Sequence, residues 1–468
     1  MTAANEMLMS HYLRLREAAR GEAVPTQSRR DAWLAALESL LRDHRGEWCA
    51  AISADFGHRA AAETELLEIF PALEAIKHAR RHLARWMRPQ RRAVSLWFQP
   101  GRAAVHYQPL GVVGIIAPWN YPLLLAVAPL AAALAAGNRV MVKMSEFAPA
   151  TAVLFRRLVD SALSDVVTVV EGDAEMARAF AALPLDHLLF TGSTAVGHSV
   201  MRAAADHLTP VTLELGGKSP AILGADFPME NFAERVMIGK TMNAGQTCIA
   251  PDYVLLPRGR EREFVAAAQE VVARCYPDIL HTLDYSSIIN ERHFGRLIGL
   301  LDDAGAQGAE IIPLAQIAGM DAETRRMPPY ALLDVKDDMR IMQEEIFGPL
   351  LPIVTYDDLD AAIAYVRARP HPLALYYFDR DHDRIQRVLK ETLSGGVTIN
   401  DTILHIAQDS LPFGGVGASG MGSYHGVEGF ETFSKKKGVF YQSRLNTVGL
   451  FKPPYGKLFQ RLVDFLLR

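Results

Sequence analysis

Short apolar runs alternate with helix-like segments through the middle of this chain, and that alternation restricts the fold more than any other feature. A strand buried on both faces is apolar throughout, and a helix between two such strands lets them pair in parallel. The runs that fit a buried strand are Val112 to Ala117, Val140 to Val142, Val166 to Val170 and His187 to Phe190. The segments Leu123 to Ala136 and Ala148 to Leu163 have helical length. The pattern predicts an α/β fold with a doubly wound parallel sheet.

A second α/β unit is expected to begin near Gly216. Its elements are a strand at Pro220 to Gly224, a helix around Asn231 to Asn243, a strand at Asp252 to Leu256 and a late strand at Gly395 to Asn400. The first 90 or so residues are expected to be helical, with an apolar stripe at helical spacing made by Trp33, Leu34, Leu37, Leu40 and Leu41. Residues 412–429 are rich in glycine and are expected to be irregular, whereas residues 435–441 suit an edge strand.

Charge and cysteine content exclude several classes of function. The 49 basic and 53 acidic residues give a net charge of −4, and no block of like charge is longer than Lys435 to Lys437, so no nucleic-acid partner is expected. The three cysteines, Cys49, Cys248 and Cys275, form neither a disulfide framework nor a metal site. They indicate a reducing cytoplasm and no bound metal. The longest apolar run has 14 residues and contains Pro129, so it is too short to span a bilayer.

Two motifs carry groups that suit covalent chemistry. Cys248 follows Gly245, Gln246 and Thr247 at the expected end of a helix, although a lone cysteine is more often a small buried apolar residue. Glu214 precedes Gly216 and Gly217. The alternative interpretation is that these residues form a structural turn without a catalytic role. A half-buried glutamate has a raised pKa and can serve as a base near neutral pH. Neither motif decides the function alone.

Two further motifs suit a nucleotide. Residues 190–197 lead a strand through Gly192 into a helix, which offers backbone N–H groups to a phosphate, although the full glycine-rich spacing is missing. Lys143 and Glu146 follow another strand, where they are either surface charges or contacts to a ribose and a phosphate.

Taken together, the motifs closely resemble the aldehyde dehydrogenase superfamily, in its order and over most of the chain. They are Pro118 to Pro122, Lys143 to Glu146, Phe190 to Ser193, Glu214 to Lys218, Gly245 to Cys248, Glu344 to Pro349 and Pro412 to Gly415. The 34-residue step from Glu214 to Cys248 agrees with that family. Segments 209–213, 250–253, 405–409 and 420–426 resemble its short branch of class 3 and fatty aldehyde dehydrogenases, and most of all the coniferyl aldehyde dehydrogenases.

The resemblance implies a mechanism. Cys248 is the expected nucleophile, and the side-chain amide of Asn120 with the backbone N–H of Cys248 is expected to hold the oxyanion. The thiohemiacetal passes a hydride to a nicotinamide, and Glu214 activates the water that hydrolyses the thioester. Transfer to coenzyme A and a non-catalytic binding role are alternatives that intact Cys248, Asn120 and Glu214 disfavour.

The resemblance also implies the binding residues. The expected cofactor contacts are Trp119, Lys143, Glu146, Gly192, Ser193, Gly197, Leu215, Glu345 and Phe347. Glu146 favours NAD, with NADP also accepted, because a carboxylate beside the ribose disfavours a 2′-phosphate. Met144 departs from the proline that the family commonly has there. The expected substrate pocket comprises Tyr121, Leu124, Ile249 and His405, whose character suits an aromatic aldehyde or, as the alternative, a medium- or long-chain aliphatic one.

The domain plan follows from the same resemblance. We expect a Rossmann-like NAD-binding domain at residues 1–92 and 110–213, an α/β catalytic domain at 214–431, a small β oligomerisation domain from strands at 93–109 and 432–445, and a tail at 446–468. The oligomerisation strands imply a homodimer. The tail carries one apolar face, which favours docking on the protein's own dimer over lying in a membrane interface.

Overall fold

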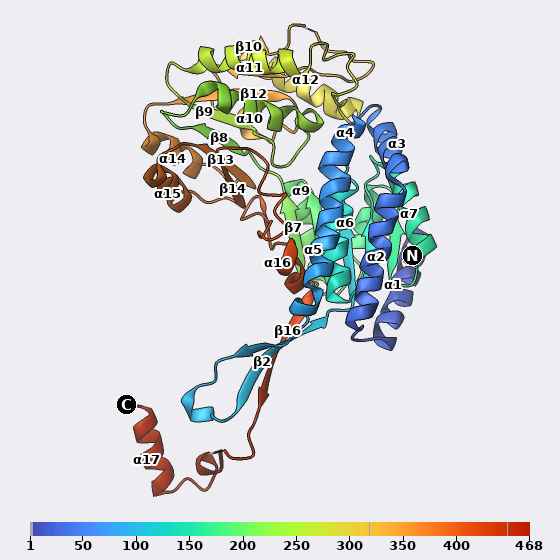
Figure 1. Ribbon diagram of the computed structural model, residues 1–468, viewed down its shortest axis with the longest axis vertical. Coiled ribbons are helices and arrows are strands. Elements are labelled where there is room, and N and C mark those ends of the chain that lie inside the picture. The colour runs from blue at the N-terminus through green and yellow to red at the C-terminus, as the bar shows by residue number, and fades with distance from the viewer. Residues whose placement is uncertain (1–2, 318, 447) are drawn as a thin grey trace.

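The computed structural model describes residues 3–317, 319–446 and 448–468, and it contains three sheets (Figure 1). The first is six-stranded, in the order β15-β7-β6-β3-β4-β5. Its strands are β3 (Val112–Ile116), β4 (Arg139–Lys143), β5 (Val167–Val170), β6 (His187–Gly192), β7 (Val211–Leu215) and β15 (Gly420–Met421). All pairs are parallel except β15 with β7. The predicted doubly wound parallel sheet is therefore confirmed.

The helices between these strands follow the sequence pattern closely. They are α6 (Leu124–Ala136), α7 (Pro149–Ala162), α8 (Ala174–Ala181) and α9 (Thr194–Ala205). Every residue of β3 and β4 is buried, as the apolar runs require. Helix α6 is buried on all sides from Leu125 to Ala136, and it ends at Gly137 in a left-handed conformation (φ +93°).

The second sheet is seven-stranded, in the order β10-β11-β12-β9-β8-β13-β14. Its strands are β8 (Pro220–Leu223), β9 (Tyr253–Pro257), β10 (Glu310–Pro313), β11 (Tyr330–Leu333), β12 (Leu350–Tyr356), β13 (Ala374–Phe378) and β14 (Gly396–Ile399). Only β10 is antiparallel to its neighbour. The helices of this part are α10 (Met229–Thr241), α11 (Glu261–Cys275), α12 (Glu291–Ala306), α13 (Arg340–Gln343), α14 (Leu359–Arg367) and α15 (His382–Glu391).

A segment from the second half of the chain returns to the first sheet. Strand β7 runs through Glu214 to Leu215, so the first sheet includes both residues. Strand β15 returns to that sheet by pairing with β7, and helix α16 (Gly426–Thr432) packs on α6. Residues 412–429 are thus not wholly irregular. Glycine at position 420 permits this return, because a Cβ there would lie 2.0 Å from the carbonyl oxygen of Leu213.

The N-terminal helices cover the first sheet. They are α1 (Ala3–Gly21), α2 (Gln27–Asp43), α3 (Arg45–Phe56), α4 (Ala61–Thr64), the π-helical turn η1 (Glu65–Ile69) and α5 (Phe70–Trp86). Helices α2 and α5 pack against each other and on α6. The expected stripe on α2 is buried, with Leu34, Leu37 and Leu41 fully inaccessible to solvent.

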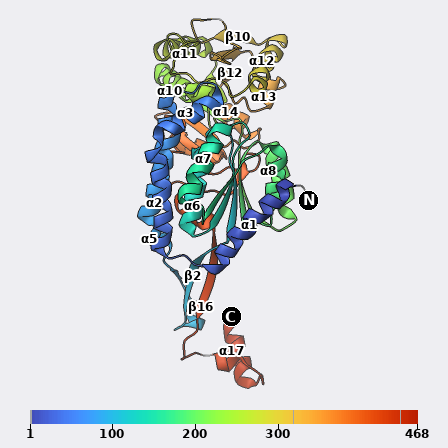
Figure 2. The ribbon, with the colours of Figure 1, turned by 90° about the vertical axis from the view of Figure 1, so that its right-hand side faces the viewer.

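A narrow arm projects from the body, and a tail follows it (Figures 1 and 2). The arm contains β1 (Gln90–Arg92), the 3-10 turn η2 (Leu96–Phe98), β2 (Arg102–Pro109) and β16 (Ser434–Tyr441). These strands form an antiparallel sheet with β16 at one edge, as the sequence predicts for this segment. The tail contains the 3-10 turn η4 (Val448–Phe451) and α17 (Lys457–Leu466). None of the helices in the described residues is long and apolar enough to cross a membrane.

Candidate active site

Cys248 lies on a sharply bent loop after α10. The 3-10 turn η3 (Met242–Gly245) brings Asn243, Ala244 and Gly245 into the left-handed region, with φ of 51°, 51° and 75°. A Cβ on Gly245 would lie 2.4 Å from the carbonyl oxygen of Gly348, so only glycine fits this position. The bend therefore fixes the direction in which the chain reaches Cys248.

Buried hydrogen bonds hold the same loop in place. The side chain of Gln246 donates to the carbonyl oxygens of Asn243 (3.0 Å) and Ser287 (3.1 Å), and it accepts from the backbone N–H of Ile289 (2.9 Å). The backbone N–H of Asn243 donates to the carboxylate of Glu63 (3.0 Å). These hydrogen bonds tie the cysteine loop to the segments that carry Glu63, Ser287 and Ile289.

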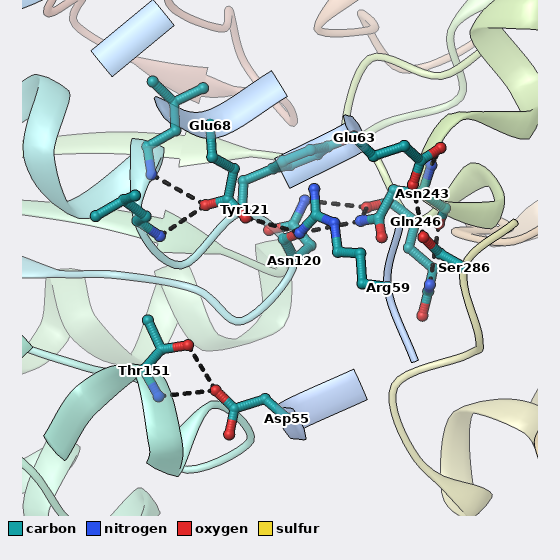
Figure 3. Close-up of polar contacts among 12 residues, drawn as sticks. Asp55, Arg59, Glu63, Glu68, Asn120, Tyr121, Thr151, Asn243, Gln246 and Ser286 are labelled. Atoms are coloured by element: carbon teal, nitrogen blue, oxygen red, sulfur yellow. Dashed lines mark hydrogen bonds and ion pairs between the residues drawn. The ribbon is translucent and has the colours of Figure 1, made fainter. Parts of the chain in front are cut away.

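Asn120 is anchored directly against this loop (Figure 3). Its side-chain amide donates to the carbonyl oxygen of Gln246 (3.2 Å), two residues before Cys248. The backbone carbonyl oxygen of Asn120 accepts from Arg59 (3.1 Å) and from the side chain of Asn243 (3.0 Å). An amide carries two hydrogens, so one N–H of Asn120 remains for an oxyanion.

A buried ion pair supports the Asn120 loop (Figure 3). Arg59 and Glu68 lie 2.7 Å apart, and both side chains are fully buried. Glu68 also accepts from the backbone N–H groups of Leu123 (2.7 Å) and Leu124 (3.1 Å). These two residues are part of the site's support, and no sequence motif reveals them.

The thiol of Cys248 faces two carboxyl groups. Burial, then the charges of Glu345 and Glu214, raise the pKa of Cys248 to about 12, against the opposing effect of backbone N–H groups at Cys248 and Ile249. Cys248 therefore rests as a thiol. Glu214 is buried with neither carboxylate oxygen hydrogen-bonded, and this burial raises its pKa well above the ordinary value. A carboxyl group without a structural partner is typical of a functional site.

Two tyrosines that sequence reasoning missed complete the surroundings. The hydroxyl of Tyr376, from β13, donates to the carbonyl oxygen of Ile249. Burial, followed by the charges of Glu214 and Cys248, raises the pKa of Tyr424. The cysteine loop is therefore enclosed by Glu214 from the first sheet and Tyr376 from the second.

The expected adenosine-side contacts lie at the carboxyl ends of β4 and β6. Lys143 ends β4, and its ammonium donates to the carbonyl oxygens of Met144 and Gly172, each at 2.7 Å. Glu146 is exposed beside it, and its charge opposes the lowering of the Lys143 pKa that burial causes. Gly192 ends β6, and Ser193 caps α9 by accepting from the backbone N–H of Val196 (3.4 Å).

Close packing explains two more of the expected cofactor residues. A Cβ on Gly197 would lie 2.7 Å from the side chain of Leu215, so glycine lets the first turn of α9 approach β7. A Cβ on Gly216 would lie 1.9 Å from the carboxylate of Glu345. Glycine at position 197 thus permits the packing of α9 on β7, and glycine at position 216 leaves room for the carboxylate of Glu345.

The loop that carries Glu345 and Phe347 is firmly held. Lys218 donates to the carbonyl oxygens of Ile341 (2.7 Å) and Glu344 (3.1 Å), and Arg296 donates to that of Glu345 (3.2 Å). Burial and then Asp252 raise the pKa of Glu345 to about 8, and one of its carboxylate oxygens has no partner.

Trp119 packs on the same loop. Its ring centroid is 5.3 Å from that of Phe347, which adopts a φ of +50°. Trp119 and Phe347 thus lie together, and their contact with a cofactor stays a prediction.

The four expected pocket residues differ in how they are placed. The hydroxyl of Tyr121 lies 2.7 Å from that of Thr247, next to Cys248 in the chain. Leu124 is half-buried, whereas Ile249 is 1% exposed and packs in the core. His405 hydrogen-bonds Thr398 (2.9 Å) and stacks on Phe413, and burial lowers its pKa to about 4.

Comparisons with known proteins identify the family of this chain. The model of the aldehyde dehydrogenase family matches residues 15–439. This chain belongs to the aldehyde dehydrogenase family. It is 55% identical over 453 residues, 97% of this chain and 94% of the other, to a protein of Pseudomonas aeruginosa named probable coniferyl aldehyde dehydrogenase. It is 48% identical to the coniferyl aldehyde dehydrogenase of a Pseudomonas species, over 92% of this chain and 90% of that one.

A solved structure gives the same fold. The substrate-bound state of Staphylococcus aureus AldH is 38% identical with a TM-score of 0.92, and the match covers 98% of this chain and 99% of that chain. The chain is thus an oxidoreductase that uses NAD(P) and acts on aldehydes. Within the described residues, no group of three His, Cys, Asp or Glu side chains is placed to hold a metal ion.

Proposed function

We propose that this aldehyde dehydrogenase oxidises an aromatic aldehyde of the coniferyl type to its acid, with Cys248 as nucleophile and Glu214 as base. The observation that carries the mechanism is the buried carboxyl group of Glu214, which has no hydrogen-bond partner and whose charge acts on Cys248. A structural glutamate would be hydrogen-bonded, because leaving a buried carboxylate unpaired is costly.

The residues divide the reaction between them. The carboxylate of Glu214 takes the proton of the Cys248 thiol as the sulfur adds to the aldehyde carbon, and Glu214 then passes this proton to solvent before the hydrolytic step. The free N–H of Asn120 and the backbone N–H of Cys248 stabilise the oxyanion of the thiohemiacetal. Glu214 then takes a proton from the water that hydrolyses the thioester. The raised pKa of Glu214 suits this role, since it makes the carboxylate a stronger base.

The residues around β4, β6 and Glu345 fit a nicotinamide dinucleotide, which accepts the hydride when bound. The unpartnered oxygen of Glu345 suits a ribose hydroxyl, and the cap of α9 offers N–H groups to a phosphate. Glu146, exposed at the end of β4, favours NAD over NADP, because it would repel a 2′-phosphate.

The proposed substrate class rests on the aromatic character near the site. Tyr121 and Tyr424 lie beside the cysteine loop, and the Phe413 ring stacks between His405 and His425. The names of two relatives, which refer to coniferyl aldehyde, support this choice.

We propose a homodimer in the cytoplasm. Strand β16 is an edge strand whose residues are largely exposed, and an unpaired edge is a template for pairing with a second copy. Cys49, Cys248 and Cys275 are all free, which suits a reducing compartment.

The test is NADH formation by the wild type and by Cys248→Ala. The panel contains coniferyl aldehyde, benzaldehyde and aliphatic aldehydes of rising length, with NAD and NADP in parallel, and each is run with and without coenzyme A. We expect turnover to vanish in Cys248→Ala and kcat/KM to be highest for coniferyl aldehyde with NAD. A higher kcat/KM for long aliphatic aldehydes would replace the substrate proposal. Folded wild type that binds NAD yet oxidises no aldehyde would refute the mechanism.

A further inference from the structure

A small cavity lies between helices α5 and α6 and the glycine-rich segment that ends in α16. Its volume is about 20 Å³, which is room for one water-sized group and too little for an aromatic ring. Five alanines form its helical walls, Ala75 and Ala79 from α5 and Ala128, Ala131 and Ala132 from α6. These small side chains leave the space open on the helix side.

Polar groups without partners border the same cavity. Trp86 is 4% exposed and its indole N–H has no acceptor, although a buried tryptophan N–H usually finds one. The Nδ1 atom of His425 is also buried without a partner. The carboxylate of Asp409 is half-buried, and it forms no hydrogen bond or ion pair with any residue that the structure describes. A donor and an acceptor thus border one water-sized space.

The backbone holds Asp409 close to the chain that carries His425. Gly426 has a φ of +51°, and a Cβ there would lie 2.2 Å from the carbonyl oxygen of Asp409. Burial, then the charge of Glu74, raises the pKa of Asp409 to about 6, against the opposing charge of Arg81. Asp409 is therefore ionised at neutral pH. A partly buried carboxylate without a partner is costly, so this position suits a ligand that donates a hydrogen bond.

An aromatic wall leads from the cysteine loop to the cavity. The hydroxyl of Tyr376 donates to the carbonyl oxygen of Ile249, and its ring centroid lies 6.2 Å from that of His405. The ring of Phe413 stacks on His405 at 6.0 Å and on His425 at 5.1 Å. The rings therefore follow one another from the residue after the nucleophile to the edge of the cavity.

Two further elements link the cavity to the reacting groups. Tyr424 borders the cavity, and burial followed by the charges of Glu214 and Cys248 raises its pKa. On α6, Leu124 of the expected substrate pocket lies one turn before Ala128 of the cavity, on the same face. Helical rise places the far end of this face about 12 Å beyond Leu124. A flat substrate held at Cys248 can therefore extend along α6 toward the cavity.

We propose that this cavity is the subsite for a hydroxyl group at the far end of an aromatic aldehyde. Asp409 accepts a hydrogen bond from that hydroxyl, and the indole N–H of Trp86 donates one to its oxygen. The proposal rests on the proposed oxidation at Cys248 and names the group by which the substrate is selected. An aldehyde that ends in hydrogen or a methyl group leaves both protein groups unpaired, and sites built for a hydroxyl reject such analogues.

The experiment compares 4-hydroxycinnamaldehyde with cinnamaldehyde, which differ only in the ring hydroxyl. We expect the wild type to have a kcat/KM at least about tenfold higher for the hydroxylated aldehyde, because a hydrogen bond to a charged group is among the stronger ones. Trp86→Phe and Asp409→Ala should each reduce this preference to below about threefold, by slowing the hydroxylated aldehyde alone. The ratio of two kcat/KM values does not depend on how much of a variant is folded.

Matched controls separate the cavity from general effects of the same substitutions. Trp33→Phe removes another buried indole N–H without a partner, on α2, where the side chain is 3% exposed and does not border the cavity. Asp302→Ala removes an exposed carboxylate from α12. Both controls should keep the preference of the wild type.

Three outcomes would overturn the proposal. Equal kcat/KM for the two aldehydes in the wild type would remove the subsite and leave the oxidation at Cys248 standing. A preference that survives both cavity variants would place the hydroxyl elsewhere and leave the cavity to a structural water. A folded wild type that oxidises neither these two nor any other aldehyde would refute the proposed function, and the subsite with it.

Discussion

At the residue scale, the burial that makes Glu214 a stronger base also lowers the stability of the folded protein when Glu214 is ionised. Burial raises the pKa of Glu214 above its unfolded value, so the folded state holds a proton that the unfolded state has already lost. The stability that protonated Glu214 contributes is therefore fully present below the ordinary glutamate pKa. This contribution is lost as the pH rises toward the raised pKa of the folded state. The roles of Cys248 and Glu214 could be predicted from their motifs, but these protonation states depend on burial that no motif encodes.

We predict that Glu214→Gln lowers kcat by about 10²- to 10⁴-fold, because the general base is lost. The same change should raise the melting temperature near neutral pH, since glutamine carries no charge to bury. Thermal melts from acidic to alkaline pH should show a gain over the wild type that grows with pH. A variant that melts below the wild type at every pH would mean that Glu214 has a structural partner in solution.

At the scale of single elements, the bend before Cys248 sets the geometry of the nucleophile. Gly245→Ala should cost about 1–2 kcal/mol from the left-handed backbone alone, and the contact with the carbonyl oxygen of Gly348 adds to it. We expect the alkylation rate of Cys248 and kcat both to fall at least about tenfold. The matched control is Gly259→Ala, where φ is +89° but no atom lies within 4 Å of the new Cβ. Equal alkylation rates in the two variants would contradict this account.

The buried pair of Arg59 and Glu68 supports the neighbouring loop. Glu68→Ala leaves Arg59 as an uncompensated buried charge, which typically costs about 3–5 kcal/mol. The thermal midpoint should drop accordingly, and kcat should fall because Asn120 loses its support. Glu65→Ala breaks only the exposed pair with Arg45 and should cost under about 1 kcal/mol. Equal losses of stability in the two variants would show that burial of the pair does not matter.

The same elements show where sequence reasoning stops. Apolar runs predicted β3 and β4 because burial on both faces leaves a local pattern. The return of β15 to β7 could not be predicted in this way, because a two-residue strand joins positions some 200 residues apart. Arg59 and Glu68 were missed for a related reason. Their partners on the Asn120 loop lie about 60 residues away. Arg59 lies in the loop between α3 and α4 and Glu68 lies in η1, so no local pattern in the sequence pairs them.

At the scale of the whole molecule, the small net charge of the chain hides an uneven distribution of charged residues. A net charge of −4 argues against binding to polyanions, yet the structure collects the cations of two segments, more than 300 residues apart, on one projection. The sequence predicted that these segments contain strands, but their charges add only once β2 and β16 pair. Strand pairing thus creates the charged surface, and one of its borders is the exposed edge of β16.

We predict that the edge of β16 joins two copies of the chain. Light scattering should give twice the chain mass of 51.6 kDa, and the thermal midpoint should rise with protein concentration, because dissociation opposes folding at high dilution. A variant with Lys452→Glu, Lys457→Glu and Arg461→Glu should keep the dimeric mass, since these residues follow the strand rather than belong to it. A wild type that stays monomeric at every concentration would contradict this prediction, because no second copy would then cover the exposed edge of β16.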